Sequence, residues 1–334
     1  MFMIAGLLSM MVAGAAFVGT GLMDDDPAED DGPEQPDTPD LAESDQNGTD
    51  LLDSADPDAG AEIEATGDQF AAGATILSGT DGDDQLDGQG GDDQIGGYAG
   101  QDTLSGGAGD DDLHGQANDD VIWGGDDNDT LHGEDGNDTL HGDGGDDELF
   151  GYDDDDVIWG GDGDDTLTGG DGDDQLHGED GNDGLMGGLG DDTLTGGAGQ
   201  DTLFGGWGND ALSGRDDTEM DFLNGGGGDD SIVAGDFDLV STGDGDDVIL
   251  LGDWITNPAE VQDFDLTSDT LVVIYDDSAA TVPQLDLTPL ENQPGSVSLS
   301  LNGVQIATLR NAGSMTLDDV MLMGQSGIAS ASTA

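Results

Sequence analysis

From residue 79 to residue 213 the chain repeats a nine-residue unit fifteen times without a break in register. Every copy has Gly at its first position, Asp at its sixth and Leu or Ile at its eighth. A strict short period indicates one small structural unit stacked on itself. Because Gly permits tight turns and close approach of the backbone, each unit is expected to present its Asp from a turn.

The fourth position supports a turn with left-handed backbone. It is Gly in twelve copies and Asn118, Asp127 or Asp154 in the other three, which are residue types that tolerate this conformation. Positions one to six are therefore predicted to turn, and positions seven to nine, as in residues 130–132, to form a short strand with the eighth residue buried. If successive strands lie on opposite sides of a flattened spiral, eighteen residues make one coil, and coils stack about 4.8 Å apart. The fold class predicted is all-β, a parallel β-roll.

The charge of the chain is extreme, with 79 acidic residues against two arginines, Arg215 and Arg310, and no lysine. Residues 79–213 hold no Lys or Arg, so salt bridges cannot balance their carboxylates. This sign of charge excludes nucleic acid and anionic membrane surfaces as partners. The chain also has no cysteine, which excludes disulfides and thiolate metal sites. A bound cation is the expected source of stability.

Stacked turns would bring the sixth-position carboxylates to about 5 Å from one another, where they repel unless cations lie between them. Ca²⁺ fits best, since it accepts six to eight carboxylate and carbonyl oxygens in flexible geometry, whereas Mg²⁺ demands a stricter octahedron and Zn²⁺ prefers nitrogen and sulfur. Roughly a dozen ions are expected, with folding coupled to binding. The predicted metal ligands are Asp84, Asp93, Asp102, Asp111, Asp120, Asp129, Asp138, Asp147, Asp156, Asp165, Asp174, Asp183, Asp192, Asp201, Asp210, Asp230 and Asp247.

Two segments precede the repeats. Residues 1–23 are apolar and long enough to span a bilayer, and they are interpreted as a membrane anchor, a cleaved signal, or a soluble amphipathic or wrongly assigned start. Residues 24–67 hold five of the nine prolines among many acidic residues, which is typical of a disordered tether. Residues 70–78 are expected to supply a lead-in strand.

The predicted roll covers residues 68–253, with the register unbroken over 79–213 and degenerate to 251. Residues 214–224 form an eleven-residue unit, where a loop or bulge is expected, and residues 234–241 form a degenerate unit with Leu239 in the Asp position.

The last predicted domain covers residues 254–334 and is expected to be a small antiparallel β cap. Its strands are predicted at 270–275, 296–301 and 304–309, with a hairpin turn at Asn302–Gly303.

Units such as GGAGDDDLH (106–114), GGDGDDTLT (160–168) and GGLGDDTLT (187–195) resemble the RTX, or haemolysin-type, calcium-binding nonapeptide. The resemblance covers about half of the chain. It implies a parallel β-roll that holds Ca²⁺ between turns through the sixth-position Asp and backbone carbonyls. It also implies export from a Gram-negative bacterium, commonly by type I secretion with a C-terminal signal, and Asp265 lies in a segment that resembles the one following such repeats. The second position departs from the motif, being Gly in only seven copies.

All four histidines occupy the ninth position, together with Trp123 and Trp159. Taking every eighteenth residue predicts one ladder of Trp123, His141, Trp159 and His177 and a second pair, His114 and His132. Stacking is favoured for that pair over a transition-metal site, because two ligands bind a metal weakly.

The sequence contains no H-E-x-x-H, no G-x-S-x-G and no cysteine nucleophile, so catalytic and organic-cofactor sites are predicted to be absent. We expect a non-enzymatic, calcium-binding, secreted or cell-surface protein with a structural or adhesive role. Membrane association would involve residues 1–23, and any surface or matrix ligand is unidentified. The alternative is an accessory or secretion module related to the C-terminal region of an exported protease or lipase, without its catalytic domain.

Overall fold

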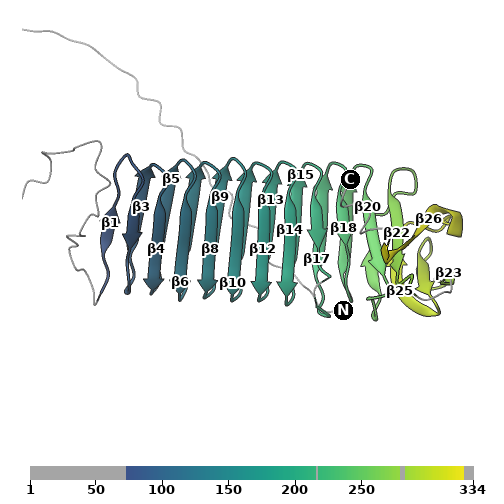
Figure 1. The fold of residues 1–334 in the computed structure, drawn as a ribbon. Helices are drawn as coiled ribbons and strands as arrows, with labels where there is room; N and C mark the ends of the chain where they lie inside the picture. The colour runs from purple at the N-terminus through teal and green to yellow at the C-terminus, as the bar shows by residue number, and fades with distance from the viewer. Residues whose placement is uncertain (1–72, 216, 279–282, 327–334) are drawn as a thin grey trace, which may run out of the picture. The chain divides into compact units, whose positions relative to one another are not determined.

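The computed structural model describes residues 73–215, 217–278 and 283–326, which form two largely parallel sheets (Figure 1). Within these ranges only residues 325 and 326 are α-helical. The predicted apolar segment 1–23 and acidic tether 24–67 lie outside the described residues. In the part of the chain that is described, no helix is long and apolar enough to cross a membrane. The lead-in strand is confirmed at its end, Ile76–Ser78.

The first sheet has 14 strands. In spatial order they are β1 (Ile76–Ser78), β3 (Gln94–Ala99), β5 (Asp112–Ala117), β7 (Thr130–Asp135), β9 (Glu148–Asp153), β11 (Thr166–Asp171), β13 (Gly184–Leu189), β15 (Thr202–Trp207), β17 (Phe222–Gly227), β19 (Leu239–Asp244), β21 (Ala259–Val261), β25 (Val304–Leu309), β24 (Val297–Leu301) and β23 (Leu285–Pro289).

The second sheet has 12 strands, and a single 3-10 helix, η1 (Leu317–Asp319), precedes its last one. In order they are β2 (Gln85–Asp87), β4 (Thr103–Ala108), β6 (Val121–Asp126), β8 (Thr139–Gly144), β10 (Val157–Asp162), β12 (Gln175–Asp180), β14 (Thr193–Ala198), β16 (Ala211–Ser213), β18 (Ser231–Val233), β20 (Val248–Gly252), β22 (Thr270–Tyr275) and β26 (Val320–Gly324).

The register of the regular repeats is eighteen residues, as predicted for a coil of two units. Leu167 on β11, for example, pairs with Leu149 on one side and Leu185 on the other. Odd-numbered and even-numbered strands therefore belong to opposite sheets along the roll (Figure 1). The eighth-position side chains from Leu86 to Leu212 point between the sheets and are at most 7% exposed. They form one narrow core, to which each strand of the regular repeats contributes one eighth-position side chain.

The strands are longer than the sequence predicted. Most run over six residues, from the seventh position of one copy to the third position of the next, as in Thr103–Ala108. The turn is therefore confined to positions four to six. The difference arises because the Gly-rich start of each copy stays paired with the coils on either side, as Gly107 does with Gly125.

Two positions of the unit adopt left-handed backbone. At position four the prediction is confirmed, with φ of 77° at Asn118 and 78° at both Asp127 and Asp154. The backbone at position two is also left-handed. The sequence did not indicate this in the copies that have a residue other than Gly there. The residues that show this conformation there are Gln89, Tyr98, Gln116, Glu134, Asp143, Tyr152 and Glu179.

The break in register falls where it was predicted. After β16 the chain forms a loop before β17, and Thr202 on β15 pairs with Phe222, twenty residues later. The next coil is shorter, because Phe222 pairs with Leu239, seventeen residues later. The two-residue insertion is thus followed by a one-residue deletion, and both sheets continue through them.

The C-terminal region is only partly an antiparallel cap. Strands β23, β24 and β25 are antiparallel, and the predicted hairpin is present, with φ of 53° at Asn302 and 82° at Gly303. The prediction was wrong for residues 270–275, since β22 pairs in parallel with β20 and with β26 and so extends the second sheet. The reason is local: Asp269 and Leu271 keep the spacing of the sixth and eighth positions, so the coil is repeated once more.

Candidate metal centre

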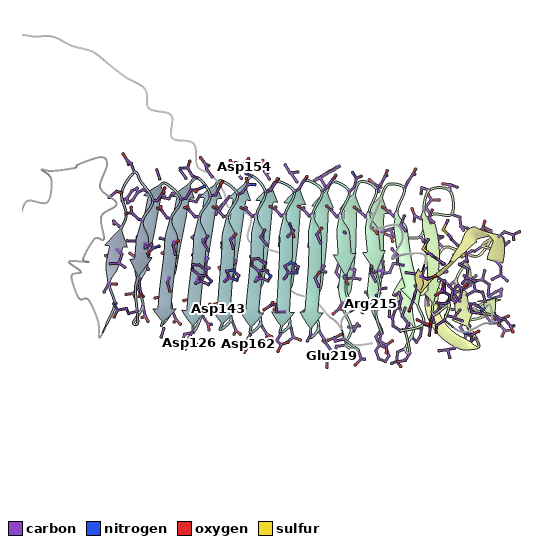
Figure 2. All side chains as sticks on the ribbon, viewed as in Figure 1. Asp126, Asp143, Asp154, Asp162, Arg215 and Glu219 are labelled. Atoms are coloured by element: carbon purple, nitrogen blue, oxygen red, sulfur yellow. The ribbon has the colours of Figure 1, made fainter. Side chains whose placement is uncertain are left out.

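The sixth-position aspartates line the two edges of the roll as buried columns. From Asp102 onward, these aspartates use Oδ1 to accept a hydrogen bond from the backbone N–H of the equivalent Asp one coil earlier. Asp93 N–H donates to Asp111 Oδ1 at 2.7 Å, and Asp111 N–H donates to Asp129 Oδ1 at 2.8 Å. The carboxylates therefore join successive coils as well as facing one another. Exposed acidic side chains lie outside these columns at both edges, as Figure 2 shows for Asp154 at one edge and Asp162 at the other.

The second carboxylate oxygen is buried without a partner. Among the described residues, seventeen aspartates have an Oδ2 atom that is inaccessible to solvent and accepts no hydrogen bond. They are Asp93, Asp102, Asp111, Asp120, Asp129, Asp138, Asp147, Asp156, Asp165, Asp174, Asp183, Asp192, Asp201, Asp210, Asp221, Asp230 and Asp247. A buried ionised oxygen without a partner is costly, so a repeated set of them is the arrangement that a bound cation would stabilise.

The first-position Gly provides the room for this oxygen. A Cβ added to Gly106 would overlap Asp111 Oδ2 and would lie 2.8 Å from the carbonyl oxygen of Gly124, one coil further on. A carboxylate oxygen and a carbonyl oxygen thus converge on the space beside the Gly Cα. This explains why the first and sixth positions are both fixed in every copy.

Burial shifts the carboxylates strongly toward the protonated form. The pKa of Asp129 is raised to about 7 and that of Asp156 to about 8, mainly by burial and in smaller part by neighbouring carboxylates, while the hydrogen bond that each accepts from a backbone N–H acts in the opposite direction. Within the described ranges, the ion pairs are those of His114 with its acidic neighbours and of Arg310 with Glu260, away from the columns. Protein cations therefore do not neutralise the columns there.

The donor set fits Ca²⁺. The columns offer carboxylate oxygens and backbone carbonyls only, which are the ligands of a hard cation with flexible coordination. The imidazoles lie on the outer faces of the sheets and not in the turns, so the donors preferred by Zn²⁺ are absent from the described part of the columns.

All seventeen aspartates predicted as ligands are buried, and sixteen of them carry the unpartnered Oδ2. Asp84 differs, because its Oδ2 accepts hydrogen bonds from Thr80 N–H at 2.6 Å and from Thr80 Oγ1 at 2.9 Å. The assignment of these residues as ligands remains a prediction.

Sequence reasoning missed two members of the columns, Asp221 and Asp238. Asp201 N–H donates to Asp221 Oδ1 at 2.9 Å, and Asp221 N–H donates to Asp238 Oδ1 at 3.1 Å. The assignment of Leu239 to the Asp position was therefore wrong, because a deletion shifts the register there. Each missed Asp lies two residues before a buried apolar residue, which is the signal that identifies it.

The predicted aromatic ladder is confirmed on the outer face of the second sheet. The rings of Trp123 and His141 stack with centroids 5.8 Å apart, those of His141 and Trp159 at 4.5 Å, and those of Trp159 and His177 at 5.8 Å. Burial lowers the pKa of His141 and of His177, which favours the neutral form of both rings.

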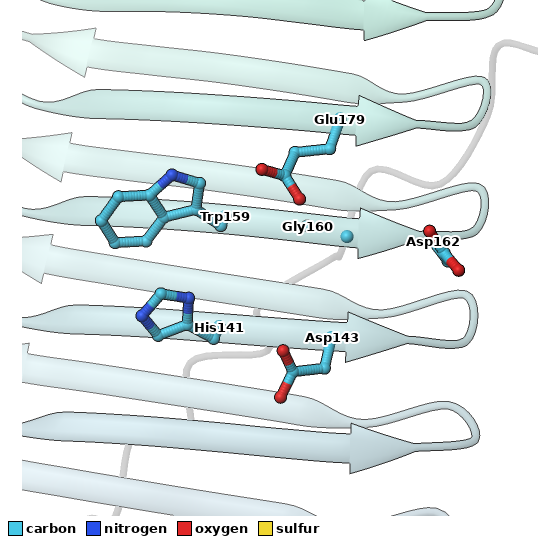
Figure 3. A pocket seen from close by; sticks show the side chains of 7 residues that line it. His141, Asp143, Trp159, Gly160, Asp162 and Glu179 are labelled. Carbon is cyan, nitrogen blue, oxygen red and sulfur yellow. The ribbon is translucent and has the colours of Figure 1, made fainter.

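A hollow lies beside the ladder, over Gly161. Its lining includes His141, Trp159, Asp143 and Glu179, and Figure 3 shows the two carboxylates next to the two rings.

The second histidine pair also stacks, with the His114 and His132 ring centroids 4.3 Å apart. Asp112 lies close enough to form a metal-ligating group with them. The nitrogens of His114 are already engaged, however, since they lie 3.0 Å from Asp112 Oδ1 and from Glu134 Oε1. His132 Nδ1 lies 3.0 Å from the Tyr152 hydroxyl. The observed contacts are those of surface stacking.

Two columns of buried carboxylate oxygens along a parallel roll are the arrangement expected of a calcium-binding repeat protein. Residues 71–218 and 221–238 match the family of the RTX calcium-binding nonapeptide repeat. The chain belongs to this family, and the resemblance noted in its sequence is confirmed.

No curated protein matches the chain. Among solved structures, it is similar to the crystal structure of extracellular lipase LipA from Serratia marcescens, with 18% identity and a TM-score of 0.20. That match covers 64% of this chain and 40% of the lipase chain, so it spans less than half of the lipase.

Proposed function

We propose that this is a non-enzymatic, exported protein whose roll folds on binding Ca²⁺ and then serves a structural or adhesive role outside the cell. The proposed organisation is an apolar segment (1–23), an acidic tether (24–67), the calcium-binding roll (68–253) and a C-terminal cap (254–334). The sixth-position aspartates, together with backbone carbonyls of the Gly-rich turns, would hold roughly a dozen ions.

The observation that carries this proposal is the set of buried, unpartnered Oδ2 atoms. Without a cation, the folded chain must place like charges one coil apart, or protonate them, inside a partly dry edge. The unfolded chain has no such cost, because its carboxylates are hydrated and far apart. Binding that is confined to the folded state stabilises it by mass action, so folding is expected to depend on the ion.

Export is supported by the family resemblance and by the expected dependence of folding on Ca²⁺. A chain that stays unfolded until it meets Ca²⁺ can be moved across an envelope in an extended form. The described roll offers repeated ligands and ordered outer faces, which suit a rigid spacer or a surface element.

The proposal is tested with circular dichroism of the full chain in Ca²⁺ and then in excess chelator. We expect the β signal to appear with Ca²⁺ and to be lost on chelation. An identical amount of Mg²⁺ is the matched control and should restore little of the signal. A β signal that survives chelation at neutral pH would contradict calcium-dependent folding.

Localisation is tested separately by fractionating cells that produce the full chain. Export predicts protein in the medium or at the cell surface, and protein confined to the cytoplasm contradicts it. A panel of hydrolase substrates checks the non-enzymatic part, and turnover that a single substitution outside the turns abolishes would overturn it.

A further inference from the structure

The histidine pair on the outer face of the first sheet has a third potential ligand beside it. His114 on β5 and His132 on β7 pair across the two strands, and their rings stack at an angle of 16°. Asp112 lies two residues before His114 on β5, so its side chain points to the same face of the sheet. One nitrogen of each ring and one oxygen of Asp112 lie within 4.8 Å of one another. The sequence indicated two ligands at this place, and the structure adds the third.

The two rings are turned the same way. His114 Nδ1 lies 3.0 Å from Glu134 Oε1, and His132 Nδ1 lies 3.0 Å from the Tyr152 hydroxyl oxygen. Glu134 and Tyr152 occupy the same position of the unit one coil apart, so both Nδ1 atoms have equivalent contacts. Because the rings are nearly parallel, both Nε2 atoms lie on the opposite side, where His114 Nε2 is 3.0 Å from Asp112 Oδ1. The Nε2 atoms are therefore the available ligands.

The contacts of the Nδ1 atoms are those that support a metal-binding imidazole. A ligating histidine usually donates its other N–H to a carboxylate or another oxygen, which fixes the tautomer and the orientation of the ring. Glu134 and the Tyr152 hydroxyl supply these oxygens. The His132 ring also stacks on Phe150, with centroids 5.2 Å apart, which restricts its rotation. Burial and, in smaller part, the charge of His114 lower the pKa of His132 against the effect of nearby carboxylates, so the unprotonated ring is favoured.

The contact between His114 Nε2 and Asp112 Oδ1 is compatible with binding. A metal ion takes the place of the proton between these atoms, and proton release accompanies metal binding by histidine. Two ligands of a tetrahedral ion, each at about 2.1 Å, are about 3.4 Å apart, which is close to the 3.0 Å of this contact. Both side chains are partly exposed, so an ion can reach them from solvent and water can complete its coordination.

The donor set separates this place from the columns. Two imidazoles and one carboxylate suit Zn²⁺, Cu²⁺ or Ni²⁺, whereas Ca²⁺ takes oxygen ligands. Among the described residues, no other group of three histidine or acidic side chains meets the same distance limit. Asp111, the neighbouring column residue, is 3% exposed, while Asp112 lies on the outer face. The two kinds of metal ligand are thus adjacent in the sequence but lie in different environments.

We propose that Asp112, His114 and His132 form a surface site for a divalent transition-metal ion such as Zn²⁺ or Cu²⁺. Glu134 and Tyr152 act as positioning residues, because they contact the Nδ1 atoms and not the ion. The site uses no column aspartate, so the folded chain binds a transition-metal ion while the columns are saturated with Ca²⁺. The inference goes beyond the proposed function and does not depend on it.

The test adds one equivalent of Cu²⁺ to the full chain in saturating Ca²⁺ and records the electron paramagnetic resonance spectrum. We expect nitrogen hyperfine splitting from two imidazoles. His114→Gln and His132→Gln should each lose the two-nitrogen pattern and weaken Cu²⁺ binding at least about tenfold. His141→Gln, in the Trp–His ladder, is the matched control and should change neither the pattern nor the affinity.

Tyr152→Phe tests the positioning role. It keeps the ring and removes only the hydroxyl that contacts His132 Nδ1. We expect Cu²⁺ binding to weaken about tenfold, as is typical when such a supporting contact is lost, while the two-nitrogen pattern remains. Unchanged affinity would remove Tyr152 from the site.

The outcomes decide the proposal. A wild-type spectrum with oxygen ligands only, or with one nitrogen, refutes the site, and so does a two-nitrogen pattern that persists in His132→Gln. Circular dichroism in Ca²⁺ shows whether each variant folds. If a variant does not fold, the wild-type spectrum decides, because the other two histidines, His141 and His177, stack on opposite sides of Trp159. Circular dichroism without Cu²⁺ tests calcium-dependent folding, so either proposal can fail alone.

Discussion

At the scale of single residues, the first-position Gly and the sixth-position Asp act as one unit. The Gly has no special conformational role at Gly106, where φ is not left-handed; it is required because the Asp111 carboxylate occupies the place of a side chain. The Asp in turn joins two coils through Oδ1 and leaves Oδ2 without a hydrogen-bond partner.

Gly106→Ala tests this pairing. The added methyl group must displace the Asp111 carboxylate, so we expect the loss of one bound Ca²⁺ and a destabilisation of about 1 to 3 kcal/mol, as for overpacking in a tight site. Gly144→Ala is the control, because its Cβ would meet nothing closer than 4.0 Å. Equilibrium dialysis counts the ions, and urea unfolding in Ca²⁺ gives the stability. Equal effects of the two substitutions would refute the explanation.

The residue pattern predicted stacked aspartates at the turns but not their burial. It also predicted the left-handed fourth position, because Gly, Asn and Asp mark that conformation directly. It did not predict left-handed backbone at Gln116 or Tyr152, since these residue types carry no such mark and the stacked coils impose it. Asp221 and Asp238 were missed for another reason: counting in steps of nine fails once the register shifts.

At the scale of the strands, the ladder of Trp and His rings links four neighbouring strands of the second sheet. Trp159 stacks on both His141 and His177, so Trp159→Thr removes two contacts. We expect a loss of about 1 to 3 kcal/mol, at roughly 0.5 to 1.5 kcal/mol per pair. Thr195→Ala, in the same column beyond the ladder, should cost less. Urea unfolding in saturating Ca²⁺ is the measurement, and equal losses would show that stacking contributes nothing.

The sequence predicted the alternation of strands between two sheets and the hairpin at Asn302–Gly303, both from strict local patterns. It underestimated strand length, because Gly-rich segments have low strand propensity and only the pairing with neighbouring coils keeps them extended. Residues 270–275 were wrongly assigned to the antiparallel cap, since an alternating apolar strand fits either kind of sheet.

At the scale of the whole molecule, the columns predict opposite effects of pH with and without metal. Their pKa values are raised in the fold, to about 6 for Asp111 and about 8 for Asp156, above the ordinary 3.8. In metal-free protein the resulting stability is complete below pH 3.8 and is lost as the pH rises through 6 to 8. We expect circular dichroism to show β structure without metal at pH 5 and its loss by pH 8.

Ca²⁺ should abolish the loss at pH 8, because the ion replaces the protons. Light scattering controls for aggregation, since pH 5 is near the sequence isoelectric point of about 4.1. A metal-free chain with more β structure at pH 8 than at pH 5 would contradict the expected direction.

The eighteen-residue register also determines how such a protein can change in length. Adding or removing two nonapeptides keeps every downstream strand in its own sheet, so the ladder, the register break and the cap remain on their present faces. Adding or removing one nonapeptide moves every downstream strand to the opposite sheet. The roll can therefore lengthen or shorten in evolution or in design without rearranging its faces only by an even number of nonapeptides. An odd number changes the outer faces of both sheets at once.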